Sequence, residues 1–137
     1  QTAAFTRRAG NAPGAPAQTL YVEPSSGRRY TGPVYVLTSD LTVSAAEIMT
    51  LGLRALDNVT HVGERTRGAF STVLTKYLPN GWEISLSNEI YTDPQGETWE
   101  GKGIDPAVYI PVFSTERPFE GHVEAVRGVV DLVRRRD

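Results

Sequence analysis

The pattern of apolar and polar positions predicts a strand, a helix and a second strand in the middle of the chain. A continuous apolar run from Val34 to Leu37 is closed by polar residues, as in a central strand that is buried on both faces. From Ser44 to Leu56, apolar residues occupy nearly every helical face, so we expect an enclosed helix rather than an amphipathic one. A strand from Asn58 to Gly63 follows, and this succession predicts a right-handed crossover in a largely parallel sheet.

The second half of the chain predicts a β-hairpin, two turns and a final helix. Two β-prone runs, 71–78 and 82–92, flank Pro79-Asn80-Gly81, which is a strong hairpin signal. After a turn at 93–96, a glycine-punctuated polar loop runs to Gly103. We expect a short strand at 108–112 and, after a break at Pro118 and Gly121, a helix from His122 to Arg136 with valines at helical spacing.

The first 32 residues predict a loop-rich lead-in. They are rich in Ala, Gly, Pro, Thr and Arg, and only Leu20, Tyr21 and Val22 form an apolar patch. We expect one short strand near Gln18 to Glu23 and a turn at Pro24 to Gly27. By itself this segment cannot supply a core.

Length, charge and cysteine count exclude several classes of function. The 137 residues suffice for one domain, and 14 basic against 16 acidic residues leave no basic patch that would indicate nucleic-acid binding. The chain has no cysteine, and its two histidines, His61 and His122, lack the spacing of zinc ligands. It contains neither a membrane-spanning apolar run nor a signal peptide. Because the chain starts at Gln1 rather than Met, we expect it to be part of a longer protein.

Ser44, at the first turn of the predicted helix, allows two interpretations. Ser44 to Glu47 fits a capping box, in which the serine and the glutamate satisfy each other's backbone N–H groups. Alternatively, the helix dipole and the converging N–H groups suit a nucleophile whose attack creates an oxyanion. Local sequence leaves both interpretations open.

Three ordered segments, TSDLTVSAAE, VGERTRGAFS and LPNGWEISLSNEIYTDPQGETWEGKGIDP, resemble the C-terminal processing, or tail-specific, serine proteases of family S41. The resemblance covers roughly Tyr30 to Val112. It implies an α/β fold, the crotonase/ClpP-like ββα spiral, of which this chain would form the second half, with a β-hairpin and a C-terminal helix. Residues 1–137 would be the C-terminal part of one protease core domain, with a lead-in at 1–32, a core at 33–113 and the C-terminal helix at 114–137.

The resemblance also implies catalytic roles for particular residues. Ser44 matches the nucleophile, the Ala45 N–H matches an oxyanion donor, and Glu100 matches a glutamate that orients a catalytic histidine. The lysine of the Ser-Lys branch is absent, because Ala69 follows Thr66-Arg67-Gly68. The chain is therefore closer to the branch of the tricorn core and the interphotoreceptor retinoid-binding protein repeats, with its base histidine upstream of Gln1. One departure is Pro106-Ala107, where the family usually has Pro-Asp.

Ordinary structural interpretations remain for several candidate residues. Glu100 can be a solvated loop acid, and His61 a structural histidine rather than a base. Lys76 and Lys102 are alternative bases only if the fold brings them to Ser44 and buries them.

The function implied by the resemblance is peptide-bond hydrolysis by a nucleophilic serine through an acyl-enzyme, without cofactor or metal. The partner would be a peptide or protein substrate, in the cell envelope or outside the cell. Two alternatives stay open: a non-catalytic binding module for an apolar ligand or peptide, and a fragment that is inactive alone.

Overall fold

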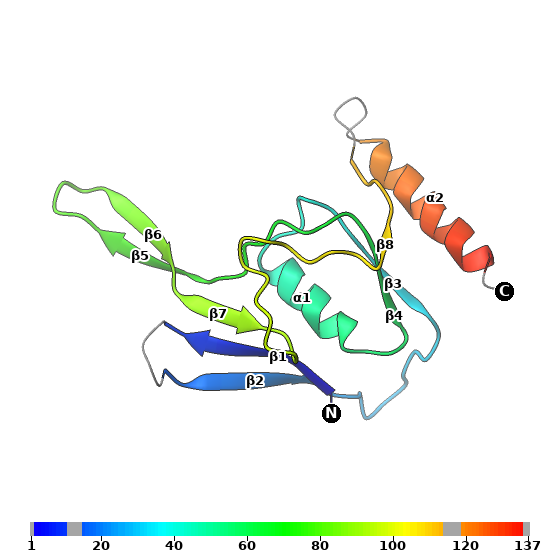
Figure 1. Ribbon diagram of the computed structural model, residues 1–137, viewed down its shortest axis with the longest axis horizontal. Helices are drawn as coiled ribbons and strands as arrows, with labels where there is room; N and C mark the ends of the chain where they lie inside the picture. The colour runs from blue at the N-terminus through cyan, green and yellow to red at the C-terminus, as the bar shows by residue number, and fades with distance from the viewer. Residues whose placement is uncertain (1, 11–14, 114–118, 136–137) are drawn as a thin grey trace.

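The computed structural model describes residues 2–10, 15–113 and 119–135 and has an α/β fold (Figure 1). Three sheets can be traced in these residues: β2-β1-β7, β3-β4-β8, and the hairpin β5-β6. Helix α1 contacts β1, β2 and β4, and so lies between the two three-stranded sheets. In chain order the elements are β1 (Thr2–Ala9), β2 (Ala17–Val22), β3 (Val34–Thr38), α1 (Ala45–Arg54), β4 (Val59–Gly63), β5 (Val73–Tyr77), β6 (Glu83–Ser87), β7 (Glu89–Thr92), β8 (Val108–Tyr109) and α2 (Gly121–Arg134).

The strand–helix–strand unit is present as predicted, with two corrections. Strands β3 and β4 pair in parallel, Val34 opposite Val59. However, β3 lies at the edge of its sheet within the described residues, and β4 is the central strand. Helix α1 is also less enclosed than predicted: its buried residues are Glu47, Thr50 and Leu51, whereas Met49 is 64% exposed. The apolar composition of α1 therefore did not indicate which face of the helix is covered, because alanine is equally favourable on an exposed helix face.

The first segment contains a strand that the sequence analysis missed. Strand β1 pairs antiparallel with both β2 and β7, and a bulge interrupts its register between Ala3 and Phe5. Because the bulge breaks the alternation of side chains, the consecutive residues Ala4 and Phe5 are both buried. The lead-in thus contributes to the core, contrary to the prediction of mostly loop.

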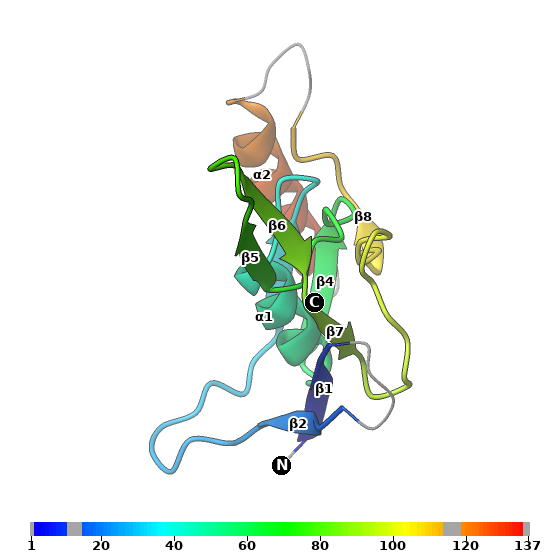
Figure 2. The ribbon, with the colours of Figure 1, turned by 90° about the vertical axis from the view of Figure 1, so that its left-hand side faces the viewer.

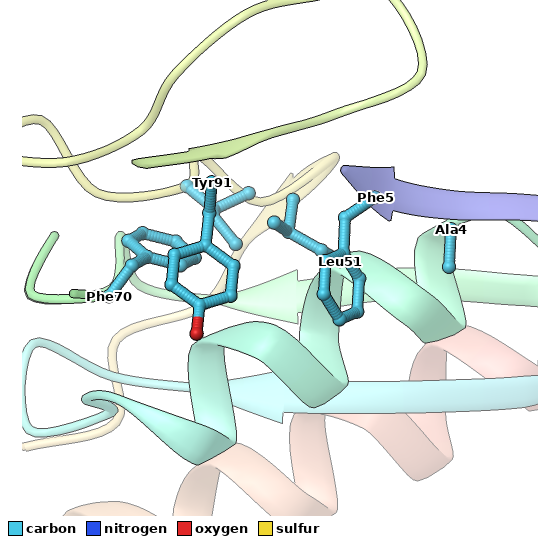
Figure 3. Packing of buried hydrophobic residues seen from close by; sticks show 6 residues of the cluster. Ala4, Phe5, Leu51, Phe70 and Tyr91 are labelled. Atoms are coloured by element: carbon cyan, nitrogen blue, oxygen red, sulfur yellow. The ribbon is translucent and has the colours of Figure 1, made fainter. Parts of the chain in front are cut away.

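The core lies between the β2-β1-β7 sheet and α1. Its buried cluster draws on both elements and on two loops (Figure 3). The ring of Tyr91 lies 5.8 Å from that of Phe5 and 6.5 Å from that of Phe70. Phe70 belongs to the loop after β4, so its burial fixes that loop against the sheet. The buried residues of this cluster are Ala4, Phe5, Leu51, Phe70, Tyr91 and Ile104.

The hairpin is confirmed and extends away from α1, on the side that Figure 2 presents to the viewer. Strands β5 and β6 pair antiparallel from Val73 opposite Ser87 to Tyr77 opposite Glu83. The predicted second strand is not continuous, since it divides at Asn88 into β6 and β7. There the Ser71 hydroxyl accepts the backbone N–H groups of Asn88 and Glu89, each at 2.9 Å, and the chain passes from one sheet to the other.

The C-terminal helix is present as α2, ending within the described residues at Arg134. Strand β8 is shorter than predicted and consists of Val108 and Tyr109. Pro118 and Arg136 lie outside the described residues. Among the residues that are described, no helix has the length and apolar character needed to cross a bilayer.

Candidate active site

Ser44 has a backbone conformation that normally requires glycine. It is the N-cap residue of α1, with φ 58° and ψ −121°, and it is the one non-glycine residue with positive φ among those described. The Ala46 N–H donates to the Val43 carbonyl at 3.2 Å, so residues 43–46 form a turn with the dihedral angles of type II′ at Ser44. Such a conformation costs about 1–3 kcal/mol and persists only where surrounding contacts enforce it.

The surroundings of Ser44 leave its hydroxyl and one neighbouring donor available. Both halves of a capping box are present in position, but only the Glu47 half makes a hydrogen bond of standard geometry, from the Ser44 N–H to Glu47 Oε2 at 3.1 Å. The Glu47 N–H donates to the Ser44 carbonyl instead, at 2.9 Å. The Ala45 N–H, the first of the helix, has no acceptor within the described part of the chain. An exposed hydroxyl beside an unpaired N–H supplies two of the groups that attack on a carbonyl requires, a nucleophile and an oxyanion donor.

Residues 68–71, here called the 68–71 strip, connect Ser44 to Glu100. Its four consecutive N–H groups are all accepted by carboxylates. Glu47 accepts from Gly68 at 2.6 Å and from Ala69 at 2.8 Å. Glu100 Oε2 accepts from Phe70 at 2.9 Å and from Ser71 at 3.0 Å. Because the Ala69 carbonyl also accepts the Ser44 N–H at 3.0 Å, Ser44 and Glu100 contact adjacent residues of the strip.

The loop that carries Glu100 is held against the same strip by its backbone. The Gly101 N–H donates to the Gly68 carbonyl at 2.7 Å. Thr66 forms a double link to Ile104, because its hydroxyl accepts the Ile104 N–H at 2.8 Å and its own N–H donates to the Ile104 carbonyl at 3.2 Å. A side chain at Gly68 would meet the backbone nitrogen of Gly103 at 2.5 Å, so the two segments approach too closely for any other residue.

The structure therefore brings Ser44, Ala45 and Glu100, the three residues to which the resemblance assigns catalytic roles, into one region. The other two candidates are not buried as a lysine base would need to be: Lys76 is exposed on β5 and Lys102 is exposed in the loop. Glu100 is more than a solvated acid, since it fixes half of the strip. The strip itself was not predicted from the sequence, where its only signal is the glycine in Thr66-Arg67-Gly68-Ala69. Groups of three or more potential metal ligands are absent from the residues described.

His61 has a structural environment rather than that of a base for Ser44. It is 3% exposed on β4, and its Nε2 lies 2.7 Å from the Thr38 hydroxyl oxygen. That hydroxyl donates to the Glu64 carbonyl at 2.7 Å, so its oxygen accepts from His61 Nε2–H. Nδ1 is then an unprotonated nitrogen with no partner among the described atoms. Desolvation by burial, together with the charge of Arg54, lowers the pKa of His61 to about 4.

Stability is expected to fall as the pH decreases from 6.5 towards 4. In that window the unfolded chain binds a proton at His61 and the folded protein does not. The contribution of the neutral His61 to the free energy of unfolding is therefore complete above pH 6.5 and is lost at lower pH. Allowing for partial solvent screening, we expect a loss of about 1–2 kcal/mol between pH 7 and pH 5 in urea unfolding. His61→Gln should remove most of this loss, whereas His122→Gln, at an exposed position on α2, should retain it. An equal pH dependence in His61→Gln would contradict the assignment.

Comparisons with known proteins identify the family. The model of peptidase family S41 matches residues 3–110. The carboxy-terminal processing protease CtpA of Bacillus subtilis is 37% identical over 81 residues, 59% of this chain and 17% of CtpA. A solved structure described as a candidate peptidase, from Parabacteroides merdae, is 27% identical with a TM-score of 0.73, covering 94% of this chain and 42% of that one. Mature CPAF in complex with lactacystin is 26% identical with a TM-score of 0.68, covering 80% of this chain and 22% of CPAF.

The chain thus spans 17% of the length of its curated relative CtpA and less than half of either solved structure. The family match itself extends over most of the chain and contains Ser44, the 68–71 strip and Glu100. The α/β fold agrees with it, since the solved neighbours include the structure described as a candidate peptidase and the photosystem II D1 C-terminal processing protease. The chain belongs to peptidase family S41.

Proposed function

We propose that this chain forms the nucleophile-bearing part of a serine peptidase that hydrolyses peptide bonds through an acyl-enzyme. The observation that carries the proposal is the strained Ser44 at the N-terminus of α1, connected through the 68–71 strip to Glu100. Family membership supports peptide or protein substrates. The base is a histidine supplied by a segment upstream of Gln1, and Glu100 orients it.

The reaction proceeds in two halves. Ser44 Oγ attacks the scissile carbonyl carbon while the histidine takes the hydroxyl proton. The Ala45 N–H and a glycine N–H from the upstream segment bind the resulting oxyanion. The intermediate collapses, the C–N bond breaks, and the histidine returns the proton to the leaving amine. Water, deprotonated by the same histidine, then attacks the acyl-enzyme and releases Ser44.

A Ser-His-Glu arrangement is favoured over a Ser-Lys pair by two observations. Ala69 occupies the position at which the Ser-Lys branch has its lysine, and its N–H is bonded to Glu47. Lys76 and Lys102 are both exposed, so neither amine is desolvated as a lysine base must be. The chain then belongs to the branch that contains the tricorn core, and alone it is inactive because it lacks the histidine. We propose an extracytoplasmic location for the whole protein.

Glu100→Gln in the full-length protein tests the role of Glu100. The glutamine oxygen can still accept the Phe70 and Ser71 N–H groups, so the strip should remain in place. The other carboxylate oxygen, Oε1, which has no partner among the described residues, becomes an NH₂ group and can no longer accept from a histidine. We expect kcat/KM for an unfolded protein substrate to fall about 10²–10⁴-fold, with a melting temperature close to that of the wild type.

Glu100→Ala is the companion variant, because it loses the strip as well and should lower both kcat/KM and the melting temperature. Full activity in Glu100→Gln would show that Glu100 only fixes the strip. An inactive wild-type protein that binds peptides would instead favour the binding module.

A further inference from the structure

Glu47 is a buried carboxylate with more partners than a helix cap requires. It is 0% exposed, and burying a charge is unfavourable unless hydrogen bonds compensate it. Three backbone N–H groups do so, from Ser44 at 3.1 Å, Gly68 at 2.6 Å and Ala69 at 2.8 Å. The first turn of α1 adds the favourable field of the helix dipole.

These bonds join two segments that are far apart in sequence. A capping glutamate bonds the N-cap N–H of its own helix, which here is Ser44. The other two donors lie 21 and 22 residues further along the chain, in the 68–71 strip. The Ser44 N–H is directed at both Glu47 Oε2 and the Ala69 carbonyl, at 3.1 and 3.0 Å. Glu47 therefore fixes the direction of the Ser44 N–H and the position of the carbonyl that shares it.

The conformation of Ser44 depends on these contacts. The φ angle of Ser44, 58°, lies in a region of backbone conformation that is unfavourable for any residue other than glycine. Ser44 keeps this conformation only because the surrounding contacts enforce it. Relaxation to an ordinary N-cap conformation would rotate the Oγ away from the site and move the N–H of Ala45. The hydrogen bonds of Glu47 oppose this rotation from inside the helix.

We propose that Glu47 is a positioning residue for the reaction, which holds Ser44 in its attacking conformation and keeps it in place relative to the 68–71 strip, to which Glu100 is hydrogen-bonded. The inference rests on the proposed function and goes beyond it, because it assigns the buried acid a role in the chemical step. Glu47 does not touch substrate. Its contribution is to the geometry of attack, and errors of about 1 Å in such geometry cost roughly 10²-fold in rate.

Glu47→Gln in the full-length protein tests the inference. The amide is nearly the same size, but its NH₂ group must face either the Gly68 N–H or the N–H groups of Ser44 and Ala69, where two donors repel. The readout is acylation by a fluorophosphonate probe, with the rate constant of the covalent step and the reversible binding constant measured separately. We expect the rate constant per folded molecule to fall about 10- to 100-fold, with the binding constant changed less than about 3-fold.

The matched control is Asp93→Asn. Asp93 also accepts from three donors, the backbone N–H groups of Gln95 and Glu97 and the indole of Trp99, but none of them belongs to Ser44 or the strip. The Asp93→Asn variant should have a lower melting temperature and an acylation rate per folded molecule within about 3-fold of the wild type. Wild-type acylation rates in Glu47→Gln, or equal losses in both variants, would overturn the inference alone. If the wild-type protein itself is not acylated, the proposed function fails and this inference fails with it.

Discussion

Replacing Ser44 by alanine is expected to reduce kcat/KM for hydrolysis of an unfolded protein substrate by about 10⁴–10⁶-fold, the loss typical of removing a catalytic serine. The reason is that the remaining donors and binding contacts can still hold the substrate, but no group can form the acyl-enzyme. The melting temperature should change little, since the Ser44 hydroxyl makes no capping hydrogen bond of standard geometry. The measurement is release of peptides from casein by the full-length protein.

A second serine gives the control for this experiment. Ser87 is exposed at the end of β6, outside the 68–71 strip and outside the catalytic residues proposed here. Ser87→Ala should hydrolyse casein at the wild-type rate. Hydrolysis that survives in Ser44→Ala would mean that Ser44 is only a helix cap.

Gly103→Ala is expected to destabilise the fold by about 3–5 kcal/mol, a large effect for a single substitution. Gly103 has φ +75°, and a Cβ there would overlap the Thr66 carbonyl oxygen, which is backbone and cannot swing aside. Relieving the overlap would separate the Glu100 loop from Thr66 and disturb the buried Ile104. Urea unfolding monitored by circular dichroism measures the change.

Gly101→Ala separates backbone strain from overlap in the same loop. Gly101 has a similar φ of +72°, but nothing lies within 4 Å of the position of its Cβ. Gly101→Ala should lower the free energy of unfolding by only about 1–2 kcal/mol, the usual penalty for a side chain in the left-handed region. Similar losses in the two variants would show that the loop is not held as tightly against Thr66 as the structure describes.

Local signals in the sequence were enough to predict the hairpin and the helix start. Asn80-Gly81 between two β-prone runs predicts an antiparallel pair without help from the rest of the fold. Strand β1 could not be found in this way, because Ala3 and Ala4 have low strand propensity and a bulge hides the alternation. Its pairing with β7, more than 80 residues away in sequence, decides its conformation.

The candidate site was predictable only in part, for a similar reason. Ser44 and Glu100 were identified through motifs, and both are hydrogen-bonded to the 68–71 strip, while their catalytic roles stay predictions. The 68–71 strip acts through its backbone N–H groups, which every residue except proline has, so its sequence carries almost no signal. The sequence around Glu47 indicated only a capping role. Two of its three hydrogen-bond partners belong to the 68–71 strip, which is distant in sequence.

Fluorophosphonate labelling of the full-length protein is the measurement that shows whether Ser44 is an activated nucleophile. Intact mass followed by peptide mapping should show a single adduct on the peptide that contains Ser44, and Ser44→Ala should show none. A folded protein that gives no adduct, or an adduct that persists in Ser44→Ala, would show that Ser44 is not the nucleophile.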